Sequence, residues 1–123
     1  ERRRAGGPAA IEAQLRTLTS PWFRHFLRYD PRPTLGRVRV PVLAINGALD
    51  LQVPARENLA AIEAALREGG NRDVRAVELP GLNHLFQTAK TGAPTEYGEI
   101  EETFSPAALE MISAWIRERF VAR

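Results

Sequence analysis

The stretch PVLAINGALDLQVP, residues 41–54, is the part of the sequence that says most about the fold. Its apolar run, Val42 to Ile45, is continuous rather than alternating with polar residues. Continuous apolar runs are typical of strands that are covered on both faces, as in parallel sheets. We therefore predict a strand over residues 38–46, followed by a turn that begins at Gly47.

The next segments repeat the pattern of an α/β protein. A helix is predicted over residues 55–68, ended by Gly69-Gly70, because apolar residues recur on one side of it: Leu59, Ile62 and Leu66. A second strand is predicted over residues 74–79. A strand–helix–strand unit with a connection of this length implies parallel strands, hence an α/β fold. Two strands are too few for an independent doubly wound sheet, so we expect missed strands or a larger sheet.

The C-terminal residues predict one more helix. Residues 87–104 are polar and read as a long loop. Ser105-Pro106 then has the signature of a helix start, with serine at the N-cap and proline at the first helical position. The predicted buried stripe of this helix has Trp115 beside it and consists of Leu109, Ile112, Ile116 and Phe120.

The N-terminal residues predict a separate helical part. Residues 8–19 have apolar side chains at helical spacing, at Ile11, Leu15 and Leu18. A short aromatic turn or helix follows over residues 22–27, and the prolines in residues 30–33 predict a rigid connection. We predict two parts: a helical segment with its linker over residues 1–36, and an α/β part over residues 37–123.

Composition excludes several classes of function. The chain is 44% hydrophobic with a net charge of +2, and its cluster of basic residues, Arg2-Arg3-Arg4, sits at one end, so we predict no nucleic-acid partner. No apolar run is long enough to span a membrane, and there is no cysteine. We predict no cofactor and no metal. The chain does not begin with methionine, so we expect a processed or excised product whose compartment stays open.

An acid and an imidazole follow the two predicted strands. Asp50 comes just after the first strand and His84 just after the second. The carboxyl ends of parallel strands share one edge of a sheet, where active sites gather, so we expect the two side chains within hydrogen-bond reach. A carboxylate that accepts a proton from His Nδ1 fixes the tautomer and leaves Nε2 free to deprotonate a nucleophile.

Residues 41–54, followed by Leu79-Pro-Gly-Leu-Asn-His84, resemble the C-terminal part of the α/β-hydrolase fold, within it the bacterial carboxylesterases of the serine-aminopeptidase-like group. In that fold the triad order is serine, then acid, then histidine. The resemblance implies that Asp50 is the acid, that His84 is the histidine, and that residues 8–33 end the lid region. It implies hydrolysis of small carboxylic esters, or of peptides and amides.

The sequence departs from the family in its nucleophile. There is no Gly-x-Ser-x-Gly elbow, and none of the serines, Ser20, Ser105 and Ser113, is predicted on a strand-to-helix turn. The oxyanion hole of the family also comes from upstream loops. We therefore expect this chain to be inactive alone and to supply only the acid and the histidine. Chloroalkane and epoxide chemistry, with an aspartate nucleophile, stays open.

Other chemically notable residues have weaker assignments. Trp22, Phe23 and Phe86 are candidates for lining a substrate pocket, although aromatic residues at such spacing more often serve packing. His25 lies among aromatic residues and is interpreted as structural or surface-exposed. Together with Asp50 and His84 it has no recognisable metal-ligand spacing.

A rival hypothesis is a non-catalytic α/β module that acts in interaction or regulation. The first predicted strand, residues 38–46, would then lack the neighbour that it has in a full hydrolase sheet. An exposed strand edge invites pairing with another chain, so we expect self-association through this edge when the chain is alone.

Overall fold

The computed structural model describes residues 7–121, so the Arg2-Arg3-Arg4 cluster lies outside the described residues. The chain divides after Pro31 into two compact units. The sequence predicts this boundary after residue 36 instead. Helix α3, Arg32–Leu35, belongs to the second unit, where it contacts helix α4, Ala55–Glu68.

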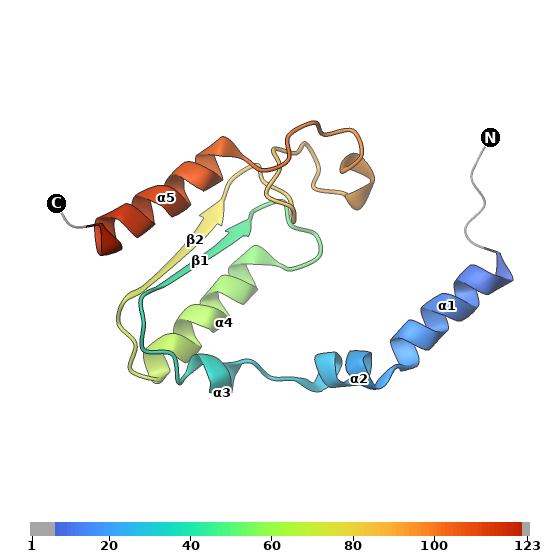
Figure 1. The fold of residues 1–123 in the computed structure, drawn as a ribbon, viewed down its shortest axis with the longest axis horizontal. Coiled ribbons are helices and arrows are strands. Elements are labelled where there is room, and N and C mark those ends of the chain that lie inside the picture. The colour runs from blue at the N-terminus through green and yellow to red at the C-terminus, as the bar shows by residue number, and fades with distance from the viewer. Residues whose placement is uncertain (1–6, 122–123) are drawn as a thin grey trace. The chain divides into compact units, whose positions relative to one another are not determined.

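The first unit consists of two helices, α1 at Pro8–Thr19 and α2 at Pro21–Arg28 (Figure 1). Ser20 separates them, because its hydroxyl accepts a hydrogen bond from the Phe23 N–H and donates one to the Thr17 carbonyl. The hydrogen bond from the Phe23 N–H to the Ser20 hydroxyl caps α2 at its N-terminus, and Pro21 occupies the first helical position. Both predicted segments are therefore helical.

The second unit is built on two parallel strands, β1 at Val42–Gly47 and β2 at Val74–Leu79. Val42 pairs with Val74 and Gly47 with Leu79, so the carboxyl ends of both strands lie together. The predicted β1 began at residue 38. The observed strand starts after Pro41, whose missing N–H cannot contribute to a ladder. Together the strands and helices form a small α/β arrangement.

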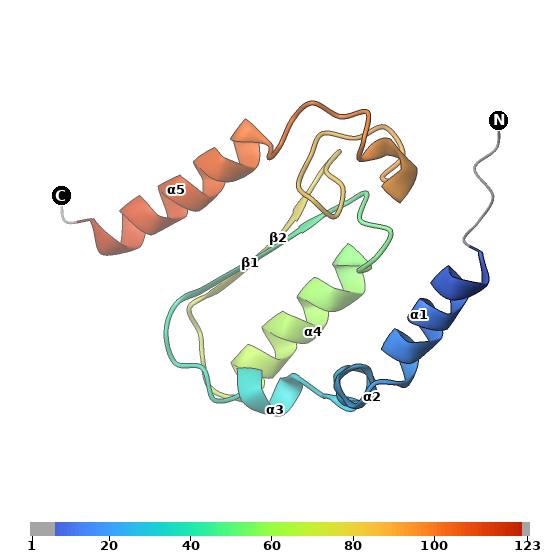
Figure 2. The ribbon, with the colours of Figure 1, turned by 45° about the vertical axis from the view of Figure 1, so that its right-hand side comes forward.

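Helices cover both faces of this pair of strands (Figures 1 and 2). On one face lies α4, which buries Ala55, Leu59, Ala65 and Leu66 and ends at Gly69-Gly70 as predicted. On the other face lies α5, Pro106–Phe120. The α5 side packs around Leu79, Leu82 and Ala108. Because apolar residues meet helices on both faces, the continuous apolar run of β1 is explained.

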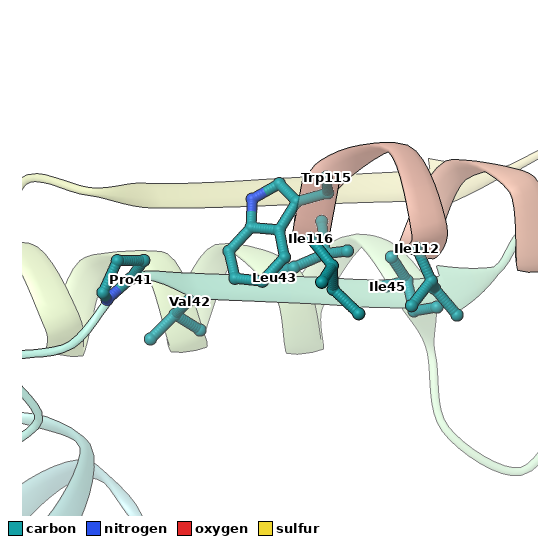
Figure 3. Close-up of a pocket in the computed structure, with 7 residues that line it drawn as sticks. All are labelled: Pro41, Val42, Leu43, Ile45, Ile112, Trp115 and Ile116. Atoms are coloured by element: carbon teal, nitrogen blue, oxygen red, sulfur yellow. The ribbon is translucent and has the colours of Figure 1, made fainter. Parts of the chain in front are cut away.

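The prediction for the buried face of α5 was wrong. Leu109, Ile116 and Phe120 are 53%, 44% and 62% exposed, whereas Ala108 and Trp115 are the buried residues. Leu109 and Phe120 lie on the exposed side of the helix, whereas Ile112 and Ile116 line an open apolar pocket beside β1 (Figure 3). Ser105 occupies the predicted N-cap position, yet its side chain makes no capping hydrogen bond. Its backbone N–H instead donates to the Phe86 carbonyl at 2.8 Å.

The segment between β2 and α5 is more ordered than a long polar loop suggests. A 3₁₀ turn, η1, spans Pro94–Glu96. The Glu96 carboxylate accepts hydrogen bonds from the Thr91 hydroxyl and from the N–H groups of Thr91 and Gly92. Gly92 lies directly against the Leu49 carbonyl, where a side chain would not fit. The segment is thereby held against the turn that carries Asp50.

Candidate acid–base site

The Asp50 carboxylate is fixed by hydrogen bonds to both oxygens. Oδ1 accepts from the backbone N–H groups of Gln52 and Val53, each at 2.9 Å. Oδ2 accepts from Asn46 Nδ2 at 3.0 Å and lies 2.9 Å from His84 Nδ1. The side chain is only 5% exposed. A carboxylate with this many partners is held in one orientation and in its charged form.

His84 is more accessible than its partner. Its side chain is 37% exposed, and Nδ1 faces Asp50. Asp50 accepts from two N–H groups at Oδ1, so it is a carboxylate and the Nδ1 of His84 carries the proton. That tautomer leaves Nε2 with its lone pair, and none of residues 7–121 donates a hydrogen bond to it. The imidazole can therefore accept a proton from an incoming group.

Two opposing effects act on the pKa of Asp50. Burial raises it, while hydrogen bonds from the Val53 N–H, from His84 and from the Gln52 N–H lower it. The hydrogen bonds outweigh burial, so the pKa of Asp50 lies below its ordinary value of 3.8. The group is ionised throughout the neutral range and stabilises a positive charge on His84 whenever that ring is protonated.

The His84 loop is built around Asn83, which is fully buried. Asn83 Oδ1 accepts from the N–H groups of Leu85 and Gln87, at 2.9 and 3.0 Å. Its Nδ2 donates to the Gln87 side chain at 2.9 Å, and its backbone N–H donates to the Gln87 carbonyl. Asn83 thus closes the turn that presents its neighbour His84.

The acid loop and the histidine loop are also joined by their backbones. The N–H groups of Ala48 and Leu49 donate to the carbonyls of Leu79 and Leu82, each at 2.9 Å. Gly47 lies so close to the histidine loop that a Cβ atom there would be 2.3 Å from the Leu82 carbonyl oxygen. The distance between the two functional loops is therefore set by main-chain contacts.

Changing Gly47 to Ala should force these loops apart. The added Cβ would be 2.3 Å and 2.6 Å from two backbone oxygens, which cannot rotate away as a side chain can. We expect a loss of about 2–3 kcal/mol in the free energy of unfolding, measured by urea titration. Gly98→Ala is the control, since nothing lies within 4 Å of a Cβ at that position. Equal stability of both variants would contradict this assignment.

Asn46 and Asn58 extend the site beyond the predicted pair. Asn46 donates to Asp50 through Nδ2, and its Oδ1 accepts from Asn58 Nδ2 on α4 at 3.1 Å. Asn46 is buried at 6% exposure. In the sequence, Asn46 stands out only as part of the stretch 41–54. A polar amide at the end of an apolar strand indicates this role in the sequence, because a buried amide needs hydrogen-bond partners.

The other predicted residues have different surroundings. Phe86 stacks on Phe104 with ring centroids 5.2 Å apart and packs against the core beside α5. Trp22 and Phe23 lie on α2 in the first unit, where their rings are 6.1 Å apart. A substrate-binding role for these three aromatic residues stays a prediction. His25, also on α2, has its ring beside Tyr29.

The three serines occupy helical or capping positions. Ser20 caps α2, Ser105 precedes α5, and Ser113 lies within α5, where it accepts a hydrogen bond from Arg117. None of them follows a strand of the described residues. Within residues 7–121, no group of three or more His, Asp or Glu side chains could hold a metal ion. Among the helices of the same residues, none is long and apolar enough to cross a bilayer.

The geometry can also be set beside known proteins. No family model, curated protein or solved structure matches this chain. The assignment of a role to Asp50 and His84 therefore rests on their hydrogen bonds, their burial and their place at the carboxyl ends of β1 and β2.

The lowered pKa of Asp50 predicts an acid-dependent loss of stability. A group whose pKa is lower in the folded chain stabilises the fold above its ordinary value of 3.8. That contribution to stability is lost as the pH falls through the pKa that Asp50 has in the folded chain. The difference in unfolding free energy between wild type and Asp50→Asn should therefore be largest above about pH 5 and shrink below it.

Urea titrations of both proteins across this range measure the difference directly. Asp73→Asn is the control for removing a negative charge with one ion-pair partner, because the Asp73 side chain is 49% exposed and pairs with Arg119 at 2.7 Å. A difference between wild type and Asp50→Asn that stays constant from neutral to acid pH would mean that Asp50 is not held by these hydrogen bonds.

Proposed function

We propose that Asp50 and His84 are the acid and the base of a serine hydrolase whose nucleophile lies outside these 123 residues. The observation that carries the proposal is the 2.9 Å contact between His84 Nδ1 and Asp50 Oδ2. It lies at the carboxyl ends of two parallel strands, and the carboxylate is otherwise saturated with donors. In this proposal the second unit is the C-terminal part of an α/β-hydrolase sheet, and residues 1–36 are lid and linker.

The mechanism follows from the two nitrogen atoms of His84. Nδ1 donates to Asp50, which holds the ring plane and the tautomer. Nε2 takes the proton of a serine hydroxyl as that oxygen attacks the carbonyl carbon of a small ester, and an acyl-enzyme forms. The imidazolium, stabilised by Asp50, then protonates the leaving alkoxide. Water hydrolyses the acyl-enzyme by the same exchange of protons, and the serine is regenerated.

A small carboxylic ester is the proposed substrate, with amides or peptides as poorer ones. The leaving group of an ester is an alkoxide, which one protonated histidine can neutralise in a single step. In this proposal, residues outside the second unit form the pocket that selects the acyl group of the ester.

The test uses the complete translation product that contains these residues. It is treated with a fluorophosphonate probe, which phosphonylates activated serines, and assayed with p-nitrophenyl acetate and p-nitrophenyl butyrate. We expect labelling of one serine outside residues 1–123, with ester hydrolysis that His84→Gln lowers about 10³–10⁴-fold. Absence of labelling, or hydrolysis that survives His84→Gln, would overturn the proposal. A halide-releasing or epoxide-opening activity without serine labelling would assign the pair to an aspartate nucleophile.

A non-catalytic interaction module is the second candidate. The observation that favours it is the apolar stripe of α5, which is exposed although apolar stripes of helices are usually buried. It predicts that binding between chains is retained in His84→Gln and that neither ester assay gives activity above background. The probe experiment therefore separates the two candidates.

A further inference from the structure

The turn that carries His84 is the tip of a short hairpin that follows β2. Leu82 and Thr88 form an antiparallel bridge, and the Asn83 N–H donates to the Gln87 carbonyl at 3.0 Å. The loop between these paired residues is three residues long and consists of His84, Leu85 and Phe86. His84 therefore opens the loop, and the residue that closes it returns the chain to Gln87.

The closing residue, Phe86, has a backbone conformation that phenylalanine rarely adopts. Its φ is 58°, and among residues 7–121 it is the only residue other than glycine with a positive φ. Three-residue hairpin loops commonly end on a residue in this left-handed region, and glycine is favoured there because a Cβ atom crowds the backbone. A phenylalanine in this conformation therefore carries strain that a glycine would not.

Two residues at the start of α5 hold Phe86 in this conformation. The Ser105 N–H donates to the Phe86 carbonyl at 2.8 Å, and the Phe104 ring stacks on the Phe86 ring with centroids 5.2 Å apart. Ser105 is only 4% exposed, so its hydrogen bond is shielded from water. Both rings also pack against the core residues Leu79, Leu82 and Ala108. The backbone and the side chain of Phe86 are thus held by the same two neighbours.

The backbone contacts between the acid loop and the histidine loop are made at the base of the hairpin. They reach the carbonyls of Leu79 and Leu82, which come before the tip. His84 lies two residues farther along the chain, where its Nδ1 meets Asp50 at 2.9 Å. The tip therefore needs an anchor of its own if the imidazole is to stay against the carboxylate.

We propose that Phe86 is a positioning residue for His84. Its left-handed backbone turns the chain back at the tip, and its carbonyl and ring dock that tip on Ser105 and Phe104. A glycine would make the same turn without strain, but it has no ring with which to dock. The strain at Phe86 is offset by a contact that glycine cannot make, and that contact holds the imidazole against Asp50.

This role differs from that of a substrate-pocket residue, for which the sequence made Phe86 a candidate. A pocket residue contacts the substrate, so its loss weakens substrate binding. A positioning residue acts through the histidine, so its loss slows proton transfer and leaves binding nearly unchanged. A residue that only packs the hairpin would affect stability and leave the imidazole as it is. The three roles therefore predict different measurements.

The strain is measured by comparing Phe86→Gly with Phe86→Ala in the 123-residue chain. Both variants remove the ring, but only alanine keeps a Cβ atom at a φ of 58°. We expect the glycine variant to have a folding equilibrium constant about fivefold larger in urea titrations. A glycine variant no more stable than the alanine variant would show that residue 86 is not left-handed in solution, and the proposal would be overturned.

The position of the imidazole is measured by the ring ¹⁵N chemical shifts of His84 in alkaline buffer, where the neutral ring reports its tautomer. In the wild type we expect the proton on Nδ1, which faces Asp50. Phe86→Gly and Phe104→Leu both remove the stack of rings, and each should give a mixture of tautomers. Phe120→Ala removes an exposed ring on α5 and is the control that should keep the wild-type tautomer.

Two features of this experiment separate positioning from a loss of folding. His25, on α2, is the other histidine of the chain, and its shifts should be the same in every variant. Phe104→Leu leaves the loop sequence intact, so it tests the dock even where Phe86→Gly does not fold. If both variants fold and keep the wild-type tautomer, Phe86 packs the hairpin without positioning His84, and the proposal fails.

The effect on catalysis rests on the proposed hydrolase function and is measured in the complete translation product. With p-nitrophenyl butyrate, Phe86→Gly should lower kcat about 10–100-fold and leave KM nearly unchanged, because a small displacement of the base is costly. A raised KM with an unchanged kcat would assign Phe86 to the substrate pocket and overturn the proposal. If no ester is hydrolysed although the His84 tautomers change as expected, the proposed function fails and the positioning role of Phe86 stands.

Discussion

Asn83→Ala should lower the free energy of unfolding by about 2–4 kcal/mol, because it leaves two buried backbone donors without an acceptor. In the folded chain the N–H groups of Leu85 and Gln87 both donate to Asn83 Oδ1. Asn83 is fully buried, so water cannot replace the lost acceptor. The same change removes the partner of the Gln87 side-chain oxygen. The turn that presents His84 should open.

Urea titration followed by circular dichroism measures the loss of stability, and the solvent accessibility of His84 is measured by its rate of modification with diethyl pyrocarbonate. Asn58→Ala is the matched control. It removes one side-chain hydrogen bond, to Asn46, in a helix where alanine is favoured. It leaves one acceptor, Asn46 Oδ1, without its donor instead of two backbone donors without an acceptor, so we expect it to cost about half as much as Asn83→Ala. If both variants were equally stable, the central position of Asn83 in the turn would be refuted.

Asp50→Asn should lower kcat for ester hydrolysis by the complete product about 10³–10⁴-fold, with KM little changed. An asparagine amide can still occupy the site, but it can donate to Nδ1 and so stabilise the tautomer in which the proton sits on Nε2. That tautomer cannot accept a proton from the nucleophile. His84→Gln removes the base itself and should lower kcat to a similar extent.

Steady-state assays with p-nitrophenyl butyrate measure both variants, and Asp73→Asn serves as the exposed control with unchanged kcat. The double variant Asp50→Asn/His84→Gln should be no slower than the slower single variant, because residues that act as a unit are not additive. Multiplied effects in the double variant would show that Asp50 and His84 act separately.

The sequence was most informative where local chemistry determines the structure. The bounds of α4 and β2 and the place of Asp50 and His84 follow from apolar spacing, from glycine and proline at the ends, and from the geometry of parallel strands. A parallel pair brings its two carboxyl ends together whatever the rest of the fold does. The 34-residue separation between Asp50 and His84 is therefore bridged by topology.

Predictions failed where burial depends on a second surface. Leu109, Ile116 and Phe120 have the spacing of a buried stripe, but spacing says only that a face is apolar, and not that a neighbour covers it. Ser105 is the N-cap residue of α5 as predicted, but its side chain makes no capping hydrogen bond, which residue type alone does not determine.

The hydrogen-bond networks around the site could not be predicted from local sequence patterns either. Asn46 reaches Asn58 on α4, and Gln52 reaches Tyr97 through a 2.9 Å hydrogen bond between distant segments. Nothing in the spacing of these residues indicates that they meet. The close backbone contacts at Gly47 and Gly92 could not be predicted from local sequence either, since they depend on which part of the backbone lies opposite each glycine.

The division of the chain after Pro31 has a consequence for how such a protein can vary. The hydrogen bonds that hold Asp50, Asn83 and His84 come from residues between Asn46 and Gln87, all in the second unit. The acid, the histidine and the residues that hold them are therefore encoded in one continuous stretch of the chain. Such a stretch can be inherited or transferred as one block, because the acid reaches the histidine without a hydrogen bond from any residue before Asn46.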